Sequence, residues 1–178
     1  MAVSNAKPKT GGAVYVAAAG STLPTDATTA LDAAFKALGY CSDDGMKNNN
    51  SRTSTEIKAW GGDVVLNPQT GKTDEFTFTL IDCTNDEVLK AVFGSSNITG
   101  ALGTGLTIKV NADELPEQCW AVETVLADGT LKRFSIPKGK ITNVGEVTYK
   151  DDEAIGYEVT LAAHPDSSGN THYEYMKS

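Results

Sequence analysis

The chain has 178 residues and a formal net charge of −8, and 40% of its residues are hydrophobic and 21% charged. This length and composition predict a single globular domain that spans residues 1–178 and argue against wholesale disorder. The acidic balance argues against a surface that grips nucleic acid, because phosphate contacts are made mainly by Lys and Arg. No run of about 18 apolar residues and no apolar leader segment occurs, so neither a membrane span nor a secretory signal is expected.

The first quarter of the chain contains one helix-like pattern. Residues 1–12 are small and polar and predict a flexible arm, and the AVYVAAAG that follows could form a strand only with a partner. Four apolar residues then have the helical spacing i, i+3, i+4 and i+7, namely Leu31, Ala34, Phe35 and Leu38. Thr25 or Asp26 would cap this helix and Gly39 would end it. The pattern predicts an amphipathic helix that covers one side of a sheet.

The next two segments predict a projecting loop and a long hairpin. Residues 41–55 contain almost nothing that can be buried, and a loop of this length is uncommon unless it acts outside its own domain. Residues 56–82 predict a hairpin in which EIKAWGGDVVL pairs with TDEFTFTLID across the turn NPQTGK. Gly61 and Gly62 in the first arm indicate a sharp bend or bulge.

The second half predicts a short helix followed by strands. Thr84 with Glu87 three residues later forms a capping box, and Gly94 ends the helix. The pair Asp128-Gly129 is a strong hairpin signal, and ITNVGEVTY with AIGYEVTLAAH predicts a second hairpin. Residues 165–178 form a polar tail that is either frayed or docked on a neighbour. These elements predict a mainly β fold, a β-sandwich or barrel with one or two short flanking α-helices and a long projecting loop.

The sequence contains no motif for catalysis, a cofactor or a metal. Gly71-Lys72-Thr73 lacks the glycine that a phosphate-binding loop needs five positions before Gly71. The two histidines and three cysteines do not cluster at metal-ligand spacing, so free thiols are expected. Trp60 and Trp120 lie in strand-like runs and predict a core or subunit-interface role. We therefore predict that the protein is not an enzyme and has no catalytic, cofactor-binding or metal-binding residue.

Several short segments of the N-terminal third resemble those of a known family. They are Pro24-Thr25-Asp26, the Ala-rich stretch Leu31–Leu38, Gly39-Tyr40, Ser42-Asp43-Asp44-Gly45 and Glu56-Ile57-Lys58-Ala59-Trp60-Gly61. The order of parts that follows is a long hairpin, a short capped helix after Asp82 and a run of strands. Together these features make residues 13–163 resemble the major tail tube proteins of long-tailed, siphovirus-type bacteriophages.

The resemblance implies a structural virion protein, made in the host cytoplasm, whose β-sandwich assembles into hexameric rings that stack into a hollow tube through which phage DNA passes. Its partners would be further copies of itself and the tail tip or initiator, tape measure and tail terminator proteins, with no membrane and no cofactor. Loop 41–55 would contact an adjacent ring, and the residues expected there are Asp43, Asp44, Lys47, Asn49 and Arg52. Strands from 56–82 would line a lumen whose acidic charge repels DNA, and the acids expected to face it are Glu56, Asp63, Asp74 and Glu75.

Two alternatives remain open from the sequence. The first is a β-sandwich module that binds carbohydrate or mediates adhesion, for which the distinguishing sign would be an exposed aromatic platform that includes Trp60, Trp120 or Tyr173. The second is the tube protein of a contractile injection machine, which would have the same fold and differ by a sheath gene beside its own.

Overall fold

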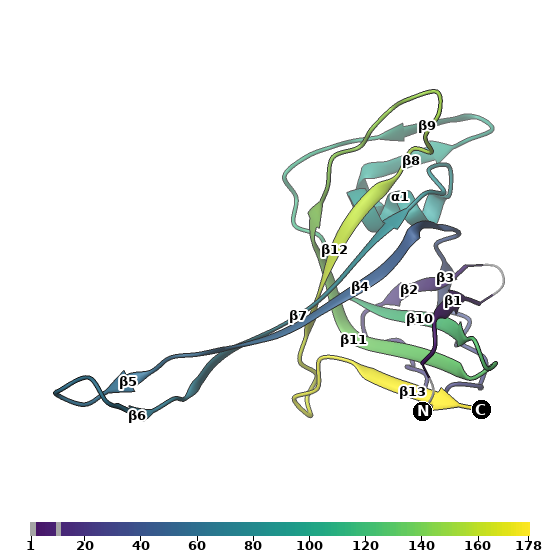
Figure 1. Cartoon of the computed structure of the whole chain (residues 1–178). Helices are drawn as coiled ribbons and strands as arrows, with labels where there is room; N and C mark the ends of the chain where they lie inside the picture. Colours follow the sequence, from purple (N-terminus) through teal and green to yellow (C-terminus); the bar gives the residue numbers. More distant parts are fainter. Residues whose placement is uncertain (1–2, 10–11) are drawn as a thin grey trace.

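One large antiparallel sheet that folds over on itself dominates the structure, a computed structural model that describes residues 3–9 and 12–178 (Figure 1). The strand order is β3-β2-β10-β11-β12-β7-β4, while β1 pairs with β10 and β13 pairs with β11. The predicted mainly β fold is therefore confirmed. The strands of this sheet are β1 (Ala6–Pro8), β2 (Val14–Ala18), β3 (Lys36–Ala37), β4 (Cys41–Ser54), β7 (Gln69–Leu80), β10 (Gln118–Leu126), β11 (Leu131–Val144), β12 (Tyr157–His164) and β13 (Tyr173–Lys177).

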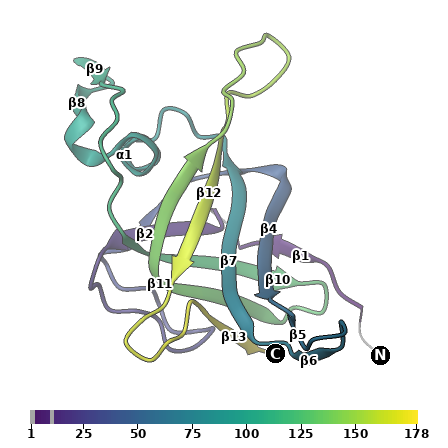
Figure 2. The same ribbon diagram turned by 90° about the vertical axis from the view of Figure 1, so that its left-hand side faces the viewer.

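The long strand β11 belongs to both layers of the folded sheet. Its first half, from Leu131 to Ile136, pairs with β10 on one side, and residues 131–135 pair with β13 on the other. Its second half, from Lys138 to Val144, pairs with β12. In Figure 2 the strands β12, β7 and β4 lie in front, and β10 with the first half of β11 crosses behind them. The sheet thus folds over on itself at β11, which creates a core between two layers of strands.

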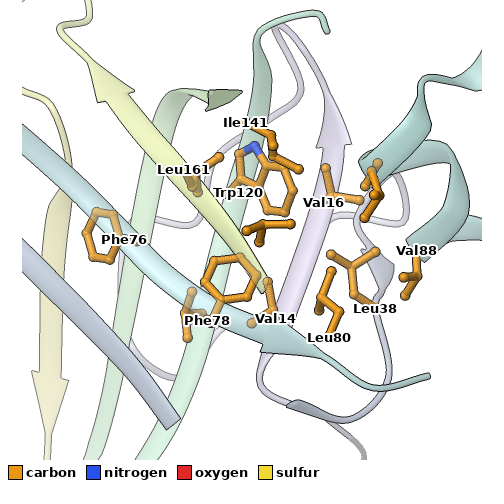
Figure 3. Close-up of a cluster of buried hydrophobic side chains, with 14 of the residues drawn as sticks. Val14, Val16, Leu38, Phe76, Phe78, Leu80, Val88, Trp120, Ile141 and Leu161 are labelled. Atoms are coloured by element: carbon orange, nitrogen blue, oxygen red, sulfur yellow. The ribbon is translucent and has the colours of Figure 1, made fainter. Parts of the chain in front are cut away.

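The core between the layers is built from alternate residues of the strands. On β7, Phe76, Phe78 and Leu80 are buried while the residues between them are partly exposed, because successive side chains of a strand point to opposite faces. The indole of Trp120, from β10 in the other layer, is fully buried and meets Phe78 edge to face with 6.3 Å between ring centroids (Figure 3). Burial of such large apolar groups is the main contribution to the stability of the fold.

A single α-helix, α1 (Asp86–Phe93), covers one end of this core. The Asn85 side chain accepts a 3.0 Å hydrogen bond from the backbone N–H of Glu87, so Asn85 is the N-cap and the predicted cap at Thr84 is wrong by one residue. The predicted end at Gly94 is confirmed, and the positive φ of 91° there suits a glycine. The helix is followed by the 3₁₀-helix η1 (Ser95–Asn97) and a small hairpin of β8 (Ile98–Ala101) and β9 (Gly105–Ile108).

The predicted helix that ends near Leu38 is wrong. The segment between β2 and β3 is irregular. It lies on the outer face of the layer that contains β2 and β10, where Phe35 packs against Ala17, Cys119 and Ala121. The buried guanidinium of Arg133 donates hydrogen bonds of 2.7 and 2.8 Å to the carbonyl oxygens of Asp26 and Thr29. A helix starting at Asp26 would need these carbonyls for its own amides, so the bonds to Arg133 replace the helix.

Residues 41–54 form a strand, not the predicted loop. β4 pairs with β7 from Met46 opposite Phe78 to Ser54 opposite Gln69, so the hairpin has 41–54 and 69–80 as its arms, and the predicted pairing of 56–66 with 73–82 is wrong. Residues 55–68 form the end of this hairpin and contain the short strands β5 (Ile57–Lys58) and β6 (Val64–Leu66), with Gly61 and Gly62 in the bend between them. Figure 1 shows that the hairpin projects far beyond the rest of the molecule.

Both ends of the chain add strands to the sheet. Within the predicted arm 1–12, Ala6–Pro8 forms β1 on the edge of β10, while residues 1–2 and 10–11 lie outside the described residues. Within the predicted tail 165–178, Tyr173–Lys177 forms β13 on the edge of β11. The tail is therefore docked, and its partner is its own chain.

Candidate functional site

The outward face of the layer β11–β12–β7–β4 is polar and rich in threonine. Residues directly opposite each other in an antiparallel pair point to the same face, and the register places Thr77 beside Thr160 on β12 and Lys47 on β4. The residues of this outward face are Lys47 and Asn49 of β4, Glu75, Thr77 and Thr79 of β7, Glu158, Thr160 and Ala162 of β12, and Lys138 and Lys140 of β11. In Figure 2 this layer faces the viewer.

The charges on this face nearly balance. It carries three lysines and two glutamates, and the ammonium of Lys140 is paired with the carboxylate of Glu114 from the segment before β10. Beside Lys138, the ring Nδ1 of His164 lies 2.7 Å from Oε1 of Glu117. The acidic character of the whole chain is thus not concentrated on this face.

The same layer has a strand edge on each side. Among the described residues, β4 has β7 as its only strand partner over its whole length, and the end of β11 from Lys140 to Val144 pairs with β12 alone. A hollow of about 370 Å³ lies beside this end of β11, between it and residues 113–115. Unpaired edges of this kind are templates for pairing with a strand of another chain.

The residues predicted for contact between rings lie along the first arm of the hairpin. Asp43 and Asp44 are exposed at its root, and Lys47 and Asn49 belong to the polar outward face. Arg52 is exposed near the end of β4, opposite Lys72 of β7. The structure therefore distributes these five residues over the length of β4 and does not gather them at one point.

The four acids predicted to face a lumen are separated by the structure. Glu75 lies on the outward face, while Glu56 and Asp63 are exposed at the end of the hairpin. Asp74 points to the opposite side of β7, where its side chain is fully buried, so it is not available to a lumen and that prediction is corrected. The physical reason is the alternation of side chains along β7, which sends Asp74 and Glu75 to opposite faces.

Asp74 instead joins the hairpin to the C-terminal segment. Its Oδ2 accepts hydrogen bonds from the hydroxyl of Thr171 and lies 2.5 Å from Nδ1 of His172, and its Oδ1 accepts a 2.9 Å bond from the amide of Asn48. Burial acts to raise the pKa of Asp74, but these hydrogen bonds and the charge of His172 outweigh it and lower the pKa. No sequence motif links these residues, because Asp74 and its partners in the C-terminal segment are almost a hundred positions apart.

The two tryptophans have opposite environments. Trp120 is fully buried, as predicted, whereas Trp60 at the end of the hairpin is fully exposed and belongs to no core. Tyr173 stacks on Tyr175 of its own strand, with 6.3 Å between the ring centroids. Burial thus excludes Trp120 from an exposed aromatic platform, while Trp60 and Tyr173 belong to different elements of the structure. Val64, Val65 and Leu66, which the sequence placed in a paired hairpin arm, are exposed near Trp60 and form uncovered apolar surface.

Within residues 3–9 and 12–178, no three side chains of the metal-ligating types lie together. The cysteines Cys41, Cys83 and Cys119 are free, as predicted, and burial raises the pKa of the Cys41 thiol to about 11. In the described part of the chain, no helix has the length and apolar character needed to cross a membrane.

Comparison with known proteins identifies one family that matches most of the chain. The model of one protein family, described as phage tail tube protein, matches residues 7–178. The match covers the folded sheet, the helix, the projecting hairpin and the C-terminal strand. A search of curated proteins finds no match.

Proposed function

Because the chain belongs to the phage tail tube protein family, and is thus a structural component of the virion, we propose that it assembles into hexameric rings that stack into the hollow tail tube of a long-tailed phage. In this proposal DNA passes through the tube without being gripped. The tube protein contacts further copies of itself, the tail tip or initiator, the tape measure protein and the tail terminator.

The observation that supports ring formation is the pair of open edges on one layer. The edge of β4 in one copy and the end of β11 in the next can pair, which joins the layers of neighbouring copies into one continuous sheet. Such a contact uses two different surfaces, so it is heterologous and closes into a ring when the rotation between copies closes. Closure removes the exposed edges and makes a barrel.

The polar outward face of this layer is the proposed lining of the tube. Its threonines and its nearly balanced charges give DNA little to bind, because non-specific affinity for DNA comes mainly from unpaired Lys and Arg. This replaces the expectation of a strongly acidic lumen with that of a nearly neutral polar one. Of the four acids first expected in the lumen, Glu75 keeps that role, while Glu56 and Asp63 are exposed at the end of the hairpin and fit contacts between subunits better.

The projecting hairpin is the proposed contact between rings. Its residues 51–73 are exposed except for the partly buried Pro68 and Gly71, and Figure 1 shows the hairpin running away from the body of the subunit. A ribbon of two strands is marginally stable alone, so its projection is best explained by a partner that covers it after assembly.

The test is negative-stain electron microscopy of the purified protein over a concentration series, with and without a tail initiator. We expect six-fold rings or hollow tubes. A chain that stays monomeric at high concentration and cannot be seeded by any tail component would refute the proposal. A map of the tube that places Thr77 and Glu158 on its outer surface would refute the lining alone, and a sheath gene beside this one would replace the non-contractile assignment with a contractile one.

A further inference from the structure

The hairpin of β4 and β7 leaves the body of the molecule at Asp74. β12 pairs with β7 from Tyr157 opposite Leu80 to Ala162 opposite Glu75. Beyond Glu75, the described residues give β7 no strand partner except β4. Asp74 is the next residue outward, and it is the last buried residue of β7 before the hairpin enters solvent (Figure 1). The contacts of Asp74 are therefore the last that the body makes with the hairpin.

A segment near the C-terminus makes these contacts. We call residues 166–174 the C-terminal clasp. Oδ2 of Asp74 accepts a hydrogen bond from the hydroxyl of Thr171 and lies 2.5 Å from Nδ1 of His172, while Oδ1 accepts a 2.9 Å bond from the amide of Asn48 on β4. The side chain of Asp74 is fully buried and that of His172 is 11% exposed. Both arms of the hairpin and the clasp thus meet at one buried carboxylate, where bonds to a charged group are strong.

The ring of His172 also packs against the hairpin and the body at once. It meets Phe76 of β7 edge to face, with 5.1 Å between ring centroids, and lies 6.3 Å from the ring of Phe134 on β11. On its other side, Nε2 of His172 lies 3.6 Å from a carboxylate oxygen of Glu174, which also pairs at 2.7 Å with Lys132 of β11. The clasp therefore joins β7 of the hairpin to β11 of the body.

The clasp has internal contacts that keep its shape. Oδ1 of Asp166 accepts hydrogen bonds of 2.8 and 3.0 Å from the backbone amides of Ser168 and Asn170, and Oδ2 accepts one of 2.7 Å from the hydroxyl of Tyr173. From Tyr173 onward the chain pairs with β11 as β13. A segment that is closed by its own hydrogen bonds and anchored as a strand can hold Asp74 in a fixed place.

We propose that the C-terminal clasp is a positioning device that fixes the direction in which the hairpin leaves the body, and that the hairpin swings at Asp74 when the clasp undocks. The device belongs to the single chain and does not rest on the proposed tube. From Asp74 to Gly62, at the bend of the hairpin, the chain runs for up to about 40 Å at about 3.3 Å per residue. A swing of about 10° at Asp74 therefore moves the far end by about 7 Å. A small change at the clasp thus becomes a large displacement at the end of the hairpin.

The experiment measures the distance from the hairpin to the body in the full chain. Nitroxide labels are attached to p-acetylphenylalanine at Lys58, near the end of the hairpin, and at Ala18 of β2, because both positions are exposed. The ketone chemistry avoids the three free cysteines. Double electron–electron resonance of the labelled chain, diluted with unlabelled chain so that only distances within one copy count, gives the distribution of this distance.

The variants separate the contacts of the clasp from its fold. Thr171→Val with His172→Phe removes both contacts to Asp74 and keeps a ring between Phe76 and Phe134. Thr171→Ser keeps the hydroxyl and is the matched control. We expect one narrow distribution for the wild type and for Thr171→Ser. The double variant, and a chain that ends at His164, should give distributions broader by about 7 Å, as a swing of about 10° produces.

Two further measurements keep the test decisive. Circular dichroism identifies the variants that are folded, and Thr171→Val alone replaces the double variant where that one does not fold. Hydrogen exchange in β13 shows whether the clasp has undocked. A broad distribution in the wild type would overturn the proposal, and so would a narrow one in a folded variant whose β13 exchanges fast. Slow exchange of β13 in the double variant would show that these contacts do not hold the clasp and would overturn it as well.

Discussion

The indole Nε1 of Trp120 donates a 3.2 Å hydrogen bond to the carbonyl oxygen of Gly139, and the two residues come from different strands at the place where the sheet folds over. A Cβ atom on Gly139 would lie 2.5 Å from Cδ1 of Trp120 and 2.9 Å from its Nε1. The largest ring of the core thus sits directly against a glycine backbone, and β11 can turn from one layer to the other only because no side chain occupies that space.

Gly139→Ala should therefore destabilise the fold. The added methyl group overpacks the core around Trp120, and we expect the free energy of unfolding to fall by about 1–3 kcal/mol. Urea denaturation followed by tryptophan fluorescence measures this. Gly103→Ala is the control, since a Cβ there would meet nothing within 4 Å. Equal stabilities of the two variants would contradict the close approach of Trp120.

Arg133→Met should be strongly destabilising. The guanidinium is almost fully buried, it donates to Oε1 of Glu123 at 3.0 Å from Nε, and it holds the irregular segment between β2 and β3. Its removal leaves Glu123 buried with only Lys9 beside it, for which we expect a loss of about 3–5 kcal/mol. The neighbouring Lys132→Met, which breaks a surface pair with Glu174, should cost less than about 1 kcal/mol.

A double variant separates the charge of this site from its packing. If Glu123 is also replaced by Met, no buried charge remains unpaired, and the loss should be smaller than for Arg133→Met alone. Thermal unfolding of the wild type, Arg133→Met, Glu123→Met and the double variant gives this comparison. A loss in the double variant that equals the sum of the two single losses would show that the ion pair itself does not explain the effect.

Asp74→Asn should loosen the C-terminal segment from the hairpin. The change keeps the shape but removes the charge that accepts bonds from Thr171 and His172, and we expect a loss of about 1–3 kcal/mol at neutral pH. Hydrogen exchange should show faster exchange in β13 than in the wild type. Glu75→Gln, one residue away on the exposed face, is the control and should change stability by less than about 0.5 kcal/mol.

The difference in unfolding free energy between the wild type and Asp74→Asn should shrink as the pH falls. The pKa of this carboxyl is lowered in the folded chain, so its ionised form contributes stability fully above the unfolded pKa near 4. That contribution is lost as the pH falls through the lower folded pKa. Denaturation curves of both chains between pH 7 and pH 2 should therefore converge at the acidic end, and a constant difference over this range would contradict the assignment.

Asn85→Ala should cost more than Thr84→Ala. The side chain of Asn85 accepts a hydrogen bond from the backbone N–H of Glu87 and donates one of 3.3 Å from its Nδ2 to the carbonyl oxygen of Ala37. Its loss should therefore reduce stability by about 0.5–2 kcal/mol. Thr84, which the capping box in the sequence had suggested, should be nearly neutral. A larger loss of stability for Thr84→Ala than for Asn85→Ala in chemical denaturation would support Thr84 as the cap instead.

Patterns that depend on neighbouring residues were sufficient for part of the fold. The Asp128-Gly129 turn, the strand within AIGYEVTLAAH and the helix that ends at Gly94 are confirmed because turn chemistry and side-chain periodicity act over a few residues. The pattern that ends at Leu38 failed because Arg133, about a hundred residues later, takes the carbonyls that a helix would use. The apolar spacing was real, but it reflects burial of Phe35 and Leu38 in an irregular segment.

The hairpin and the candidate assembly surfaces were harder to predict. β4 is exposed on both faces along most of its length, so burial imposed no alternation on its sequence and it resembled a loop. Asp74 could not be distinguished from Glu75 without the register of β7. The open strand edges carry no motif, because the pairing of strands distant in the sequence decides which edges stay open.

The strand order also determines when the nascent chain can fold. β2 pairs with β10, and β7 lies between β4 and β12. Two strands from the first half of the chain therefore need partners from the second half before the sheet can form. At about 5–20 residues per second, synthesis from Leu80 to Tyr157 takes several seconds, during which β7 can pair only with β4. The hairpin of β4 and β7 thus leaves the ribosome before the strands of the body that later holds it.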